Sequence, residues 1–348
     1  MKIGFKNIMV LLALILGGSS CDSFLDVQPK GEVLEGDLLK DAKGFENALY
    51  GVYAKMGSTN LYGQNLSYSA LDLMAQYYTS TNNEEVEPLI KYDYTNTKAE
   101  DLFYNIWCDM YSNIAYANNV LEHLEKFSPA DMQFYNIYKG EALGLRAFMH
   151  FDLLRIFSEQ ITVNESADGI PYSTRFSLFA PDILKSKDVY KRIISDLRSA
   201  EQLLDDEELY ASASSNANFL KDQNIHFNLQ AVQATLARVY LTEGTLDSAL
   251  YYAQQVIQAP GLSLLDYTDI AGDLAGKLSS KETVFGIYSK NFAEPVIKIL
   301  HNSQTAYSFE MRYNIQQLYQ INGAGNDYRW GAWYTYNNTI KYWKLDRS

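Results

Sequence analysis

Hydrophobic residues recur at three- and four-residue steps along much of this chain, which is the spacing of amphipathic α-helices. The clearest repeat lies between Asn228 and Ile257, where Gly244 and Thr245 separate two such stretches. Glycine suits the left-handed residue that ends a helix, and threonine can cap the helix that follows. We therefore expect a hairpin of two helices. Its apolar positions are Leu229, Val232, Leu236, Val239 and Tyr240, then Leu246, Ala249, Leu250, Tyr252, Ala253, Val256 and Ile257.

The same period predicts several more helices before the hairpin. Local capping signals support three of them: Thr97 to Glu100 has the form of a capping box, Ser128 precedes Pro129 at a helix start, and Ser186 can cap the fourth long helix. Long loops join these elements. The expected helices span residues 43–56, 70–78, 97–124, 130–157 and 188–204.

The helical pattern weakens after Pro260. Residues 283–288 read TVFGIY, which is the best strand candidate in the chain, although its glycine counts against a regular strand. Residues 309–321 have the spacing of a short helix, and the aromatic tail from residue 327 alternates enough to indicate extended structure. The fold class expected overall is all-α with little β structure.

The hairpin also resembles a tetratricopeptide repeat. Leu236, Ala237, Tyr240 and Ala249 match the small and large positions of that repeat, whereas Gln233 stands where an aromatic residue is expected. The resemblance implies a superhelix of stacked helix pairs with long loop insertions. An ordinary helical hairpin in another all-α domain is the alternative.

The first residues have the three parts of a secretory signal. Lys2 and Lys6 precede an apolar run that is too short to span a bilayer, and small residues follow up to Cys21. A cysteine at this point indicates a bacterial lipoprotein that is cleaved and acylated at Cys21, although Gly18 replaces the usual leucine. We expect a signal peptide over 1–20, an extended acylated tether over 21–35 and one domain over 36–348. A plain secreted protein is the alternative.

Composition narrows the function classes. The 348 residues carry a formal charge of −13, which removal of the basic leader makes more negative. A chain with this negative charge is repelled by nucleic-acid phosphates and anionic lipid surfaces, so neither is an expected partner. Its aromatic residues are mainly tyrosines, 28 against 16 Phe and 4 Trp, and tyrosine suits surfaces that need both an apolar ring and a polar group.

No residue pattern indicates catalysis. The four histidines are scattered, the two cysteines have neither metal-site nor redox spacing, and phosphate-binding and nucleophile motifs are absent from the sequence. Acidic pairs such as Asp205 and Asp206 fall at helix ends or in loops, so we interpret them as solvated charge rather than glycosidase carboxylates. We expect a protein that is not an enzyme and has no metal or other cofactor.

Aromatic residues with polar neighbours are the candidates for binding. A sugar ring offers an apolar face and a rim of hydroxyls, so its site needs a flat aromatic ring with amide or carboxyl groups beside it. An early and a late loop segment supply this mixture. The alternative for each ring is ordinary packing in the core. The candidate ligand-binding residues are Tyr62, Gln64, Tyr77, Tyr78, Asn82, Tyr307, Trp330, Trp333 and Tyr334.

Six stretches in order resemble the SusD/RagB family of outer-membrane nutrient-binding lipoproteins of Bacteroidota. They are Cys21 with FLDVQPKGEV, YNIWCDMYSNIAYANNVLEHLE, GEALGLRAFMHFDLLRIFS, VYKRIISDLRSAEQLL, the hairpin and ETVFGIY. The resemblance implies a surface-exposed, lipid-anchored protein that binds oligosaccharide or polysaccharide on its loops. It also implies delivery of that ligand to a SusC-like TonB-dependent transporter.

One departure and one alternative follow from this comparison. The helical segments that the family carries after a KYxK-like stretch do not follow Lys341 to Lys344, so the chain resembles the first two thirds of a member and we expect it to be truncated. The alternative function is a tetratricopeptide-type protein-interaction scaffold on the outer membrane, or a binder of peptides rather than glycans.

Overall fold

The structure is a computed structural model that describes residues 38–80, 86–205, 218–266 and 281–289. It also describes the single positions 84, 269 and 294 and three short strands nearer the C-terminus. The described residues are mainly helical, as the sequence predicts. The α-helices are α4 (Ala42–Met56), α5 (Ala70–Met74), α6 (Glu87–Lys91), α7 (Thr97–Leu124), α8 (Tyr135–Phe157), α9 (Ser186–Leu204), α11 (Leu229–Glu243) and α12 (Leu246–Ile257).

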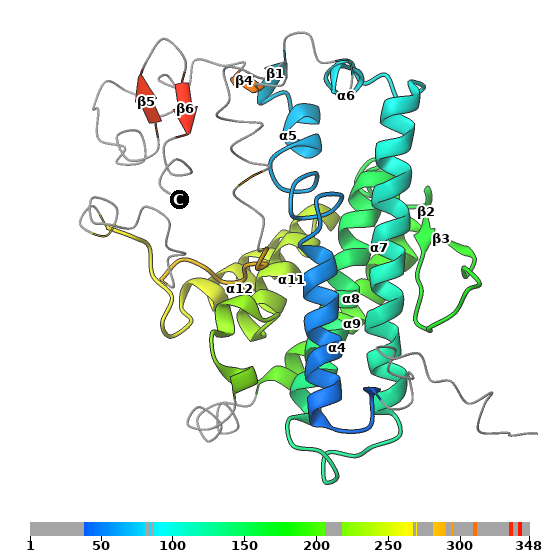
Figure 1. Ribbon diagram of the computed structural model, residues 1–348, viewed down its shortest axis with the longest axis vertical. Helices are drawn as coiled ribbons and strands as arrows, with labels where there is room; N and C mark the ends of the chain where they lie inside the picture. The colour runs from blue at the N-terminus through cyan, green and yellow to red at the C-terminus, as the bar shows by residue number, and fades with distance from the viewer. Residues whose placement is uncertain are drawn as a thin grey trace, which may run out of the picture.

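Helix α8 is the centre of the bundle. It packs between α7 and α9, while α4 lies on α7 and α11 lies on α9 (Figure 1). Apolar residues occupy every side of α8 rather than one stripe, which is typical of a helix that other helices surround. Its first and last turns include the fully buried Tyr138 and the nearly buried Leu154.

Two glycines of α8 allow this close packing. A Cβ atom at Gly140 would lie 2.7 Å from the Leu204 side chain of α9, and one at Gly144 would lie 2.5 Å from the Phe227 ring. Real Cβ contacts are longer than this, so a larger residue would push the neighbouring element away. The two glycines in the stretch GEALGLRAF thus allow Leu204 and Phe227 to pack closely against α8.

The α11–α12 hairpin is confirmed. Gly244 has φ +93°, and its amide donates to the carbonyl of Tyr240 at 3.0 Å, which ends α11 in a left-handed turn. Thr245 occupies the N-cap position of α12, but its hydroxyl donates to Glu243 rather than accepting from the helix. Of the apolar set on α12, Ala249 and Tyr252 are buried. Leu246, Leu250 and Ile257 are exposed.

Three predicted helix starts differ in detail. Asn96, not Thr97, caps α7 by accepting a hydrogen bond from the amide of Lys98. The helix predicted from residue 130 begins at Tyr135, because Asp131 closes a local turn with Ser128 and the backbone then turns left-handed at Phe134. Ser186 lies inside the first turn of α9 and makes no capping hydrogen bond.

The predicted strand over 283–288 is wrong. This segment is extended, but its backbone bonds to a short 3₁₀ turn (Gln223–Ile225) and to the start of α11 instead of a neighbouring strand. Gly286 donates to the carbonyl of Asn224 at 2.7 Å, and Asn228 donates to the carbonyl of Val284 at 3.0 Å. Phe285 packs against the Phe227 ring, so the segment covers the core as an irregular strap.

Three antiparallel strand pairs complete the described structure. Strand β1 (Tyr78–Ser80) pairs with β4 (Phe309–Met311), β2 (Asp168–Pro171) with β3 (Ile183–Lys185), and β5 (Tyr334–Tyr336) with β6 (Ile340–Tyr342). The last pair confirms extended structure in the tail at those positions. Strands replace the predicted ends of two helices, since the helix over 70–78 stops at Met74 and residues 309–311 are not helical.

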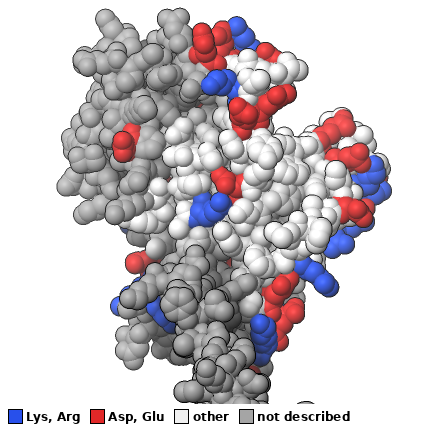
Figure 2. Space-filling view, turned by 45° about the vertical axis from the view of Figure 1, so that its right-hand side comes forward, with Lys and Arg blue, Asp and Glu red and all other residues white. Residues whose placement is uncertain are grey.

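Charges of both signs are interspersed on the outer surface. Figure 2 shows acidic and basic side chains mixed along the edges of one face, with a broad uncharged area between them. No basic patch gathers on the described part of this face.

Candidate functional site

One end of the bundle exposes several tyrosines. Helices α5 and α6, strands β1 and β4 and the first turn of α7 lie together at the upper end in Figure 1. Tyr77, Tyr92 and Tyr94 have 58%, 50% and 46% of their surface exposed. We call the described residues 70–80 and 86–104 the loop-end face. It contains two of the early candidates predicted from the sequence, Tyr77 and Tyr78.

The tyrosines at 92 and 94 are fixed in place although they are exposed. The Tyr92 hydroxyl donates to the carbonyl of Met74 at 2.8 Å, which links α6 to α5. The Tyr94 ring lies 5.7 Å from the Phe103 ring in an edge contact and 6.5 Å from the Tyr92 ring. Each ring therefore keeps one face for solvent or ligand while the other side rests on protein. Neither residue is among the candidates predicted from the sequence.

Asp72 is a carboxyl group of the same loop-end face. Its carboxyl is half-buried on α5 and has no hydrogen-bond or ion-pair partner among the described residues. Burial raises the pKa of Asp72 to about 6. The amide of Tyr77 donates to the Asp72 carbonyl at 3.0 Å, so the backbones of the two residues are in contact. A half-buried carboxyl without a partner is a ready acceptor for a ligand hydroxyl.

The strand pair β1–β4 connects the two predicted loop segments. Tyr78 lies opposite Met311 and Ser80 opposite Phe309 in this pair. The early segment around Tyr77 and Tyr78 thus meets the chain immediately after the late candidate Tyr307. Tyr334 lies in β5. The candidates Asn82, Tyr307, Trp330 and Trp333 lie outside the described residues, as does the predicted lipidation site Cys21.

Tyr62 is part of the bundle wall. Its ring packs 5.5 Å from the Phe148 ring, and its hydroxyl donates to Asp152 at 3.0 Å. Burial and the Asp152 carboxylate raise the pKa of Tyr62 well above its ordinary value. The Tyr62 hydroxyl is therefore already used within the protein, and the half-buried Gln64 lies in the same turn. Tyr62 and Gln64 stay predictions as ligand contacts.

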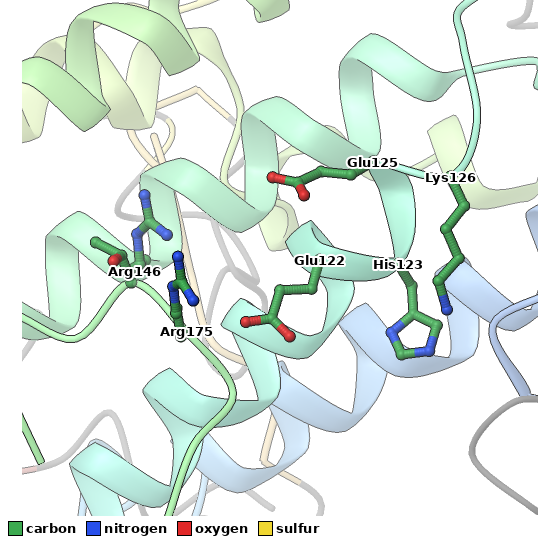
Figure 3. A pocket seen from close by; sticks show the side chains of 7 residues that line it. Glu122, His123, Glu125, Lys126, Arg146 and Arg175 are labelled. Carbon is green, nitrogen blue, oxygen red and sulfur yellow. The ribbon is translucent and has the colours of Figure 1, made fainter. Parts of the chain in front are cut away.

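A second feature lies at the other end of α7 and was not predicted. A cavity of about 680 Å³ opens where α7 ends, beside α8 and the loop between β2 and β3 (Figure 3). Its lining is almost entirely charged or polar. We call it the α7-end pocket, and its residues are Glu122, His123, Glu125, Lys126, Arg146, Thr174 and Arg175.

A buried polar network fixes Arg146, one of the residues that line this pocket. Arg146 donates two hydrogen bonds to the Asp196 carboxylate, at 2.7 and 2.8 Å, and a third to Asn118 at 3.0 Å. The Tyr172 hydroxyl donates to the same carboxylate at 2.5 Å, because burial and Asp196 raise the pKa of Tyr172 and keep it protonated. This network joins α7, α8, α9 and the loop after β2.

His150 completes the network as a neutral ring. Its Nε2 accepts a hydrogen bond from the amide of Ser173 at 3.0 Å, so its proton lies on Nδ1, which donates to the carbonyl of Arg146 at 2.8 Å. Burial lowers the pKa of His150 to about 3. The Tyr172 ring stacks on the His150 ring at 4.0 Å. Protonation would remove the acceptor for Ser173, so the neutral ring holds the loop in place.

Two negative findings concern the described residues. Among the described residues, no three His, Cys, Asp or Glu side chains converge in a way that could hold a metal ion. Within the same residues, no helix has the length and hydrophobicity that a membrane span requires.

A family model described as starch-binding associating with outer membrane matches residues 23–241. Among curated proteins, the chain is 28% identical over 212 residues to a SusD-like protein, P38, of Formosa agariphila, covering 58% of this chain and 38% of that protein. A second SusD-like protein of that organism, P2, is 26% identical over 263 residues, covering 73% of this chain and 46% of the relative. The chain thus matches less than half the length of these relatives.

Solved structures share the fold. A SusD superfamily protein from Bacteroides thetaiotaomicron superposes with a TM-score of 0.67 at 22% identity, covering 85% of this chain and 64% of that protein. A SusD-like carbohydrate binding protein from Bacteroides vulgatus superposes with a TM-score of 0.63 at 19% identity, covering 80% and 58% of the two chains. At these identities the similarity establishes a common architecture.

Proposed function

The chain belongs to the SusD-like family, and from this premise we propose that it is a cell-surface lipoprotein that captures oligosaccharides and passes them unchanged to a TonB-dependent transporter. Three parts make up the proposal: a saccharide-binding surface, a lipid anchor and a transporter partner. The described residues bear on the first part. The other two follow from the sequence and from the family resemblance.

The observation that carries the proposal is the set of exposed tyrosines on the loop-end face, to which Asp72 also belongs. Tyr77, Tyr92 and Tyr94 offer flat apolar faces at the loop end, and the Asp72 carboxyl has no partner among the described residues. A sugar needs this combination, because its C–H face loses water on an aromatic ring while its hydroxyls keep hydrogen bonds. The relative from Bacteroides vulgatus is itself named as carbohydrate binding.

Binding without hydrolysis is part of the proposal. Glycosidases place two carboxyl groups on either side of the scissile bond, one to donate a proton and one to attack or activate water. We assign Asp72 a different role, as an acceptor of a ligand hydroxyl. Incubation with each oligosaccharide that binds, followed by product analysis, should return the starting saccharide alone. Release of shorter sugars would show that the protein is an enzyme.

The anchor would be formed at Cys21. Residues 22–37 separate this cysteine from the first described residue, Leu38, and an extended stretch of that length reaches about 55 Å. The domain could then sit above a partner embedded in the same membrane. The variant Cys21→Ala should move from the membrane fraction to the soluble fraction, and unchanged fractionation would contradict the lipoprotein assignment.

Calorimetric titration tests the saccharide surface. We would titrate neutral hexasaccharides of glucose, xylose and mannose, beginning with maltohexaose, into the parent and into Tyr77→Ala and Tyr94→Ala. Loss of one stacking ring removes about 100 Å² of apolar contact, or about 2.5 kcal/mol at most, so binding should weaken at least several-fold. Tyr116→Ala is the matched control, because Tyr116 is 47% exposed in the middle of α7. Equal binding by all variants would remove the loop-end face from the proposal.

A second candidate function is a protein-interaction scaffold. The observation that favours it is the stripe of Leu246, Leu250 and Ile257 on α12, where each side chain is at least 59% exposed. Repeat proteins bind peptide helices on such surfaces. Leu250→Glu separates the two functions, because it should leave saccharide titrations unchanged. Loss of transporter association in that variant, with normal saccharide binding, would assign the stripe to the partner.

A further inference from the structure

The α7-end pocket and the loop-end face are separate places on one helix. Glu100 lies in the first turn of α7 and Glu125 directly follows its last residue. With a rise of about 1.5 Å per residue, these two positions are about 38 Å apart along the axis. One sugar residue cannot contact both ends. A ligand in the pocket would therefore occupy a site of its own.

Several charged groups of the pocket have no partner in the part of the chain that the structure describes. The side chains of Glu125, Lys126 and Arg175 are exposed and make no hydrogen bond or ion pair with any described residue. Figure 3 shows the guanidinium groups of Arg146 and Arg175 together on one side of the pocket, with Glu122 and Glu125 reaching towards it from α7. Donors and acceptors thus face the same space.

The protein holds the inner groups of this pocket in fixed positions. The Arg146 side chain is only 9% exposed and is held by Asp196, Asn118 and Tyr172, which fixes its guanidinium beside the pocket. One oxygen of Glu122 accepts from the amide of Phe176 at 2.9 Å, which leaves the other oxygen for a ligand. Groups that are ordered before binding lose little conformational entropy when a ligand arrives.

The balance of charge indicates the ligand chemistry. Arg175 and Lys126 would repel a cation, and Glu122 and Glu125 would repel an anion. A neutral ligand with many hydroxyls satisfies both sets, because each hydroxyl can accept from a guanidinium and donate to a carboxylate. The cavity of about 680 Å³ is within the usual range for small-ligand sites.

We infer that the α7-end pocket is a second saccharide-binding site, specific for neutral sugar residues and independent of the loop-end face. This inference rests on the proposed function, from which it takes the saccharide class. The apolar tip of the β2–β3 loop extends the site beyond the pocket. Phe176 follows Arg175 and is 43% exposed, while Leu178 and Phe179 are almost fully exposed, so their surfaces can take the C–H face of a longer oligosaccharide.

The test removes each site in turn and titrates with maltohexaose and the xylose and mannose hexasaccharides. The pocket variant is Arg175→Leu with Glu125→Gln, two exposed side chains whose loss breaks no described contact. The loop-end variant is Tyr77→Ala with Tyr94→Ala. The matched control is Arg192→Leu, an exposed arginine on α9 away from the pocket. Melting curves establish that each variant is folded.

The parent should bind a hexasaccharide at two sites, and the loop-end variant should keep one of them. Adding the pocket substitutions to the loop-end variant should weaken this remaining site about tenfold or more, because hydrogen bonds to two charged groups are lost. The Arg192 control should bind as the parent does.

Two results would overturn the inference, and they differ in what else they imply. If the loop-end variant loses all binding and the pocket variant binds normally, the pocket is not a saccharide site, while the proposed function stands. If the parent binds none of the hexasaccharides, both the inference and the saccharide function are wrong. Binding that survives the loop-end substitutions but not the pocket substitutions would support the pocket and remove the loop-end face.

Discussion

Charged groups are paired in the interior of the bundle, whereas some of those near the two ends of α7 have no partner among the described residues. Around α8 each named charge is satisfied: Arg146 with Asp196, Glu141 with Tyr53 and His226, and Asp152 with Tyr62 and Arg238. At the ends of α7, Asp72 and Arg175 have no partner among the described residues. Stability and binding therefore depend on different side chains, and substitutions should separate them.

The interior networks also explain why the loops are ordered. Asn118 on α7 donates to the carbonyls of Ser173 and Arg175, and His150 on α8 accepts from the Ser173 amide. A buried network of this kind is costly when one member is lost, because the remaining groups stay desolvated without a partner. The pocket at the α7 end therefore depends on the same interior that stabilises the bundle.

The largest expected effect is the loss of Arg146. Arg146→Ala leaves the Asp196 carboxylate without its cation and the Asn118 side-chain oxygen without its donor, and breaking a buried ion pair typically costs about 3–5 kcal/mol. We expect a loss of that size in the free energy of unfolding, measured by urea denaturation. Arg192→Ala, at an exposed position of α9, should change it by less than about 0.5 kcal/mol. Equally small losses of unfolding free energy in both variants would contradict the difference between interior and surface charges.

The next effect is in the hairpin. Ala249 is 7% exposed on α12, so Ala249→Trp places a large ring inside the bundle, and overpacking typically costs about 1–3 kcal/mol. Leu250→Trp is the matched control one residue on, because Leu250 is 59% exposed. Thermal melts should show a lower midpoint for the first variant alone. Equal midpoints in both would mean that the register of the hairpin is wrong.

A smaller effect is the response of His150 to pH. Its pKa of about 3 in the folded protein lies below its unfolded value of about 6.5, so the unfolded state takes up a proton first as the pH falls. The contribution of the neutral His150 ring to the free energy of unfolding is complete above pH 6.5. It should decline by about 1.3 kcal/mol between pH 7 and 5.5. His150→Gln should lack this component. A parent and variant with the same pH slope would contradict a neutral buried ring.

Asp72 should give the smallest effect and one of opposite sign. Its pKa is raised to about 6, so between pH 4 and 6 the folded state holds the proton that the unfolded state has released. Stability therefore falls as the pH rises through this range and stays lower above it. Asp72→Asn should melt at a higher temperature than the parent at pH 7 and at nearly the same temperature at pH 4. A lower midpoint at pH 7 would indicate that the carboxylate has a stabilising partner.

The sequence predicts the helices because their signals are local. The period of α9, the left-handed glycine at 244 and the apolar face of α4 are each contained within a few turns. Failures occur where a distant partner decides the structure. TVFGIY has the composition of a strand, but Asn224 and Asn228 supply its hydrogen bonds, so it forms no sheet.

The candidate sites also divide into those with a local signal in the sequence and those that depend on distant partners. Tyr77 was predicted because exposed aromatic residues in polar loops are visible in the sequence, and the structure places it on the surface. Tyr62 looked equivalent, yet the folded chain brings Phe148 and Asp152 against it. The α7-end pocket could not be predicted, because Glu122, Arg146 and Arg175 come together only when α7, α8 and the β2–β3 loop pack.

Hydrogen exchange of the parent protein, with and without saturating maltohexaose, tests the central claim most directly. Backbone amides that a ligand covers or rigidifies exchange more slowly, whereas those of an untouched helix do not change. Saccharide binding at the loop-end face predicts increased protection in peptides covering residues 70–94, with no change over the hairpin at 229–257. Unchanged exchange at 70–94, with new protection confined to 229–257, would contradict the account and place the ligand on the repeat surface.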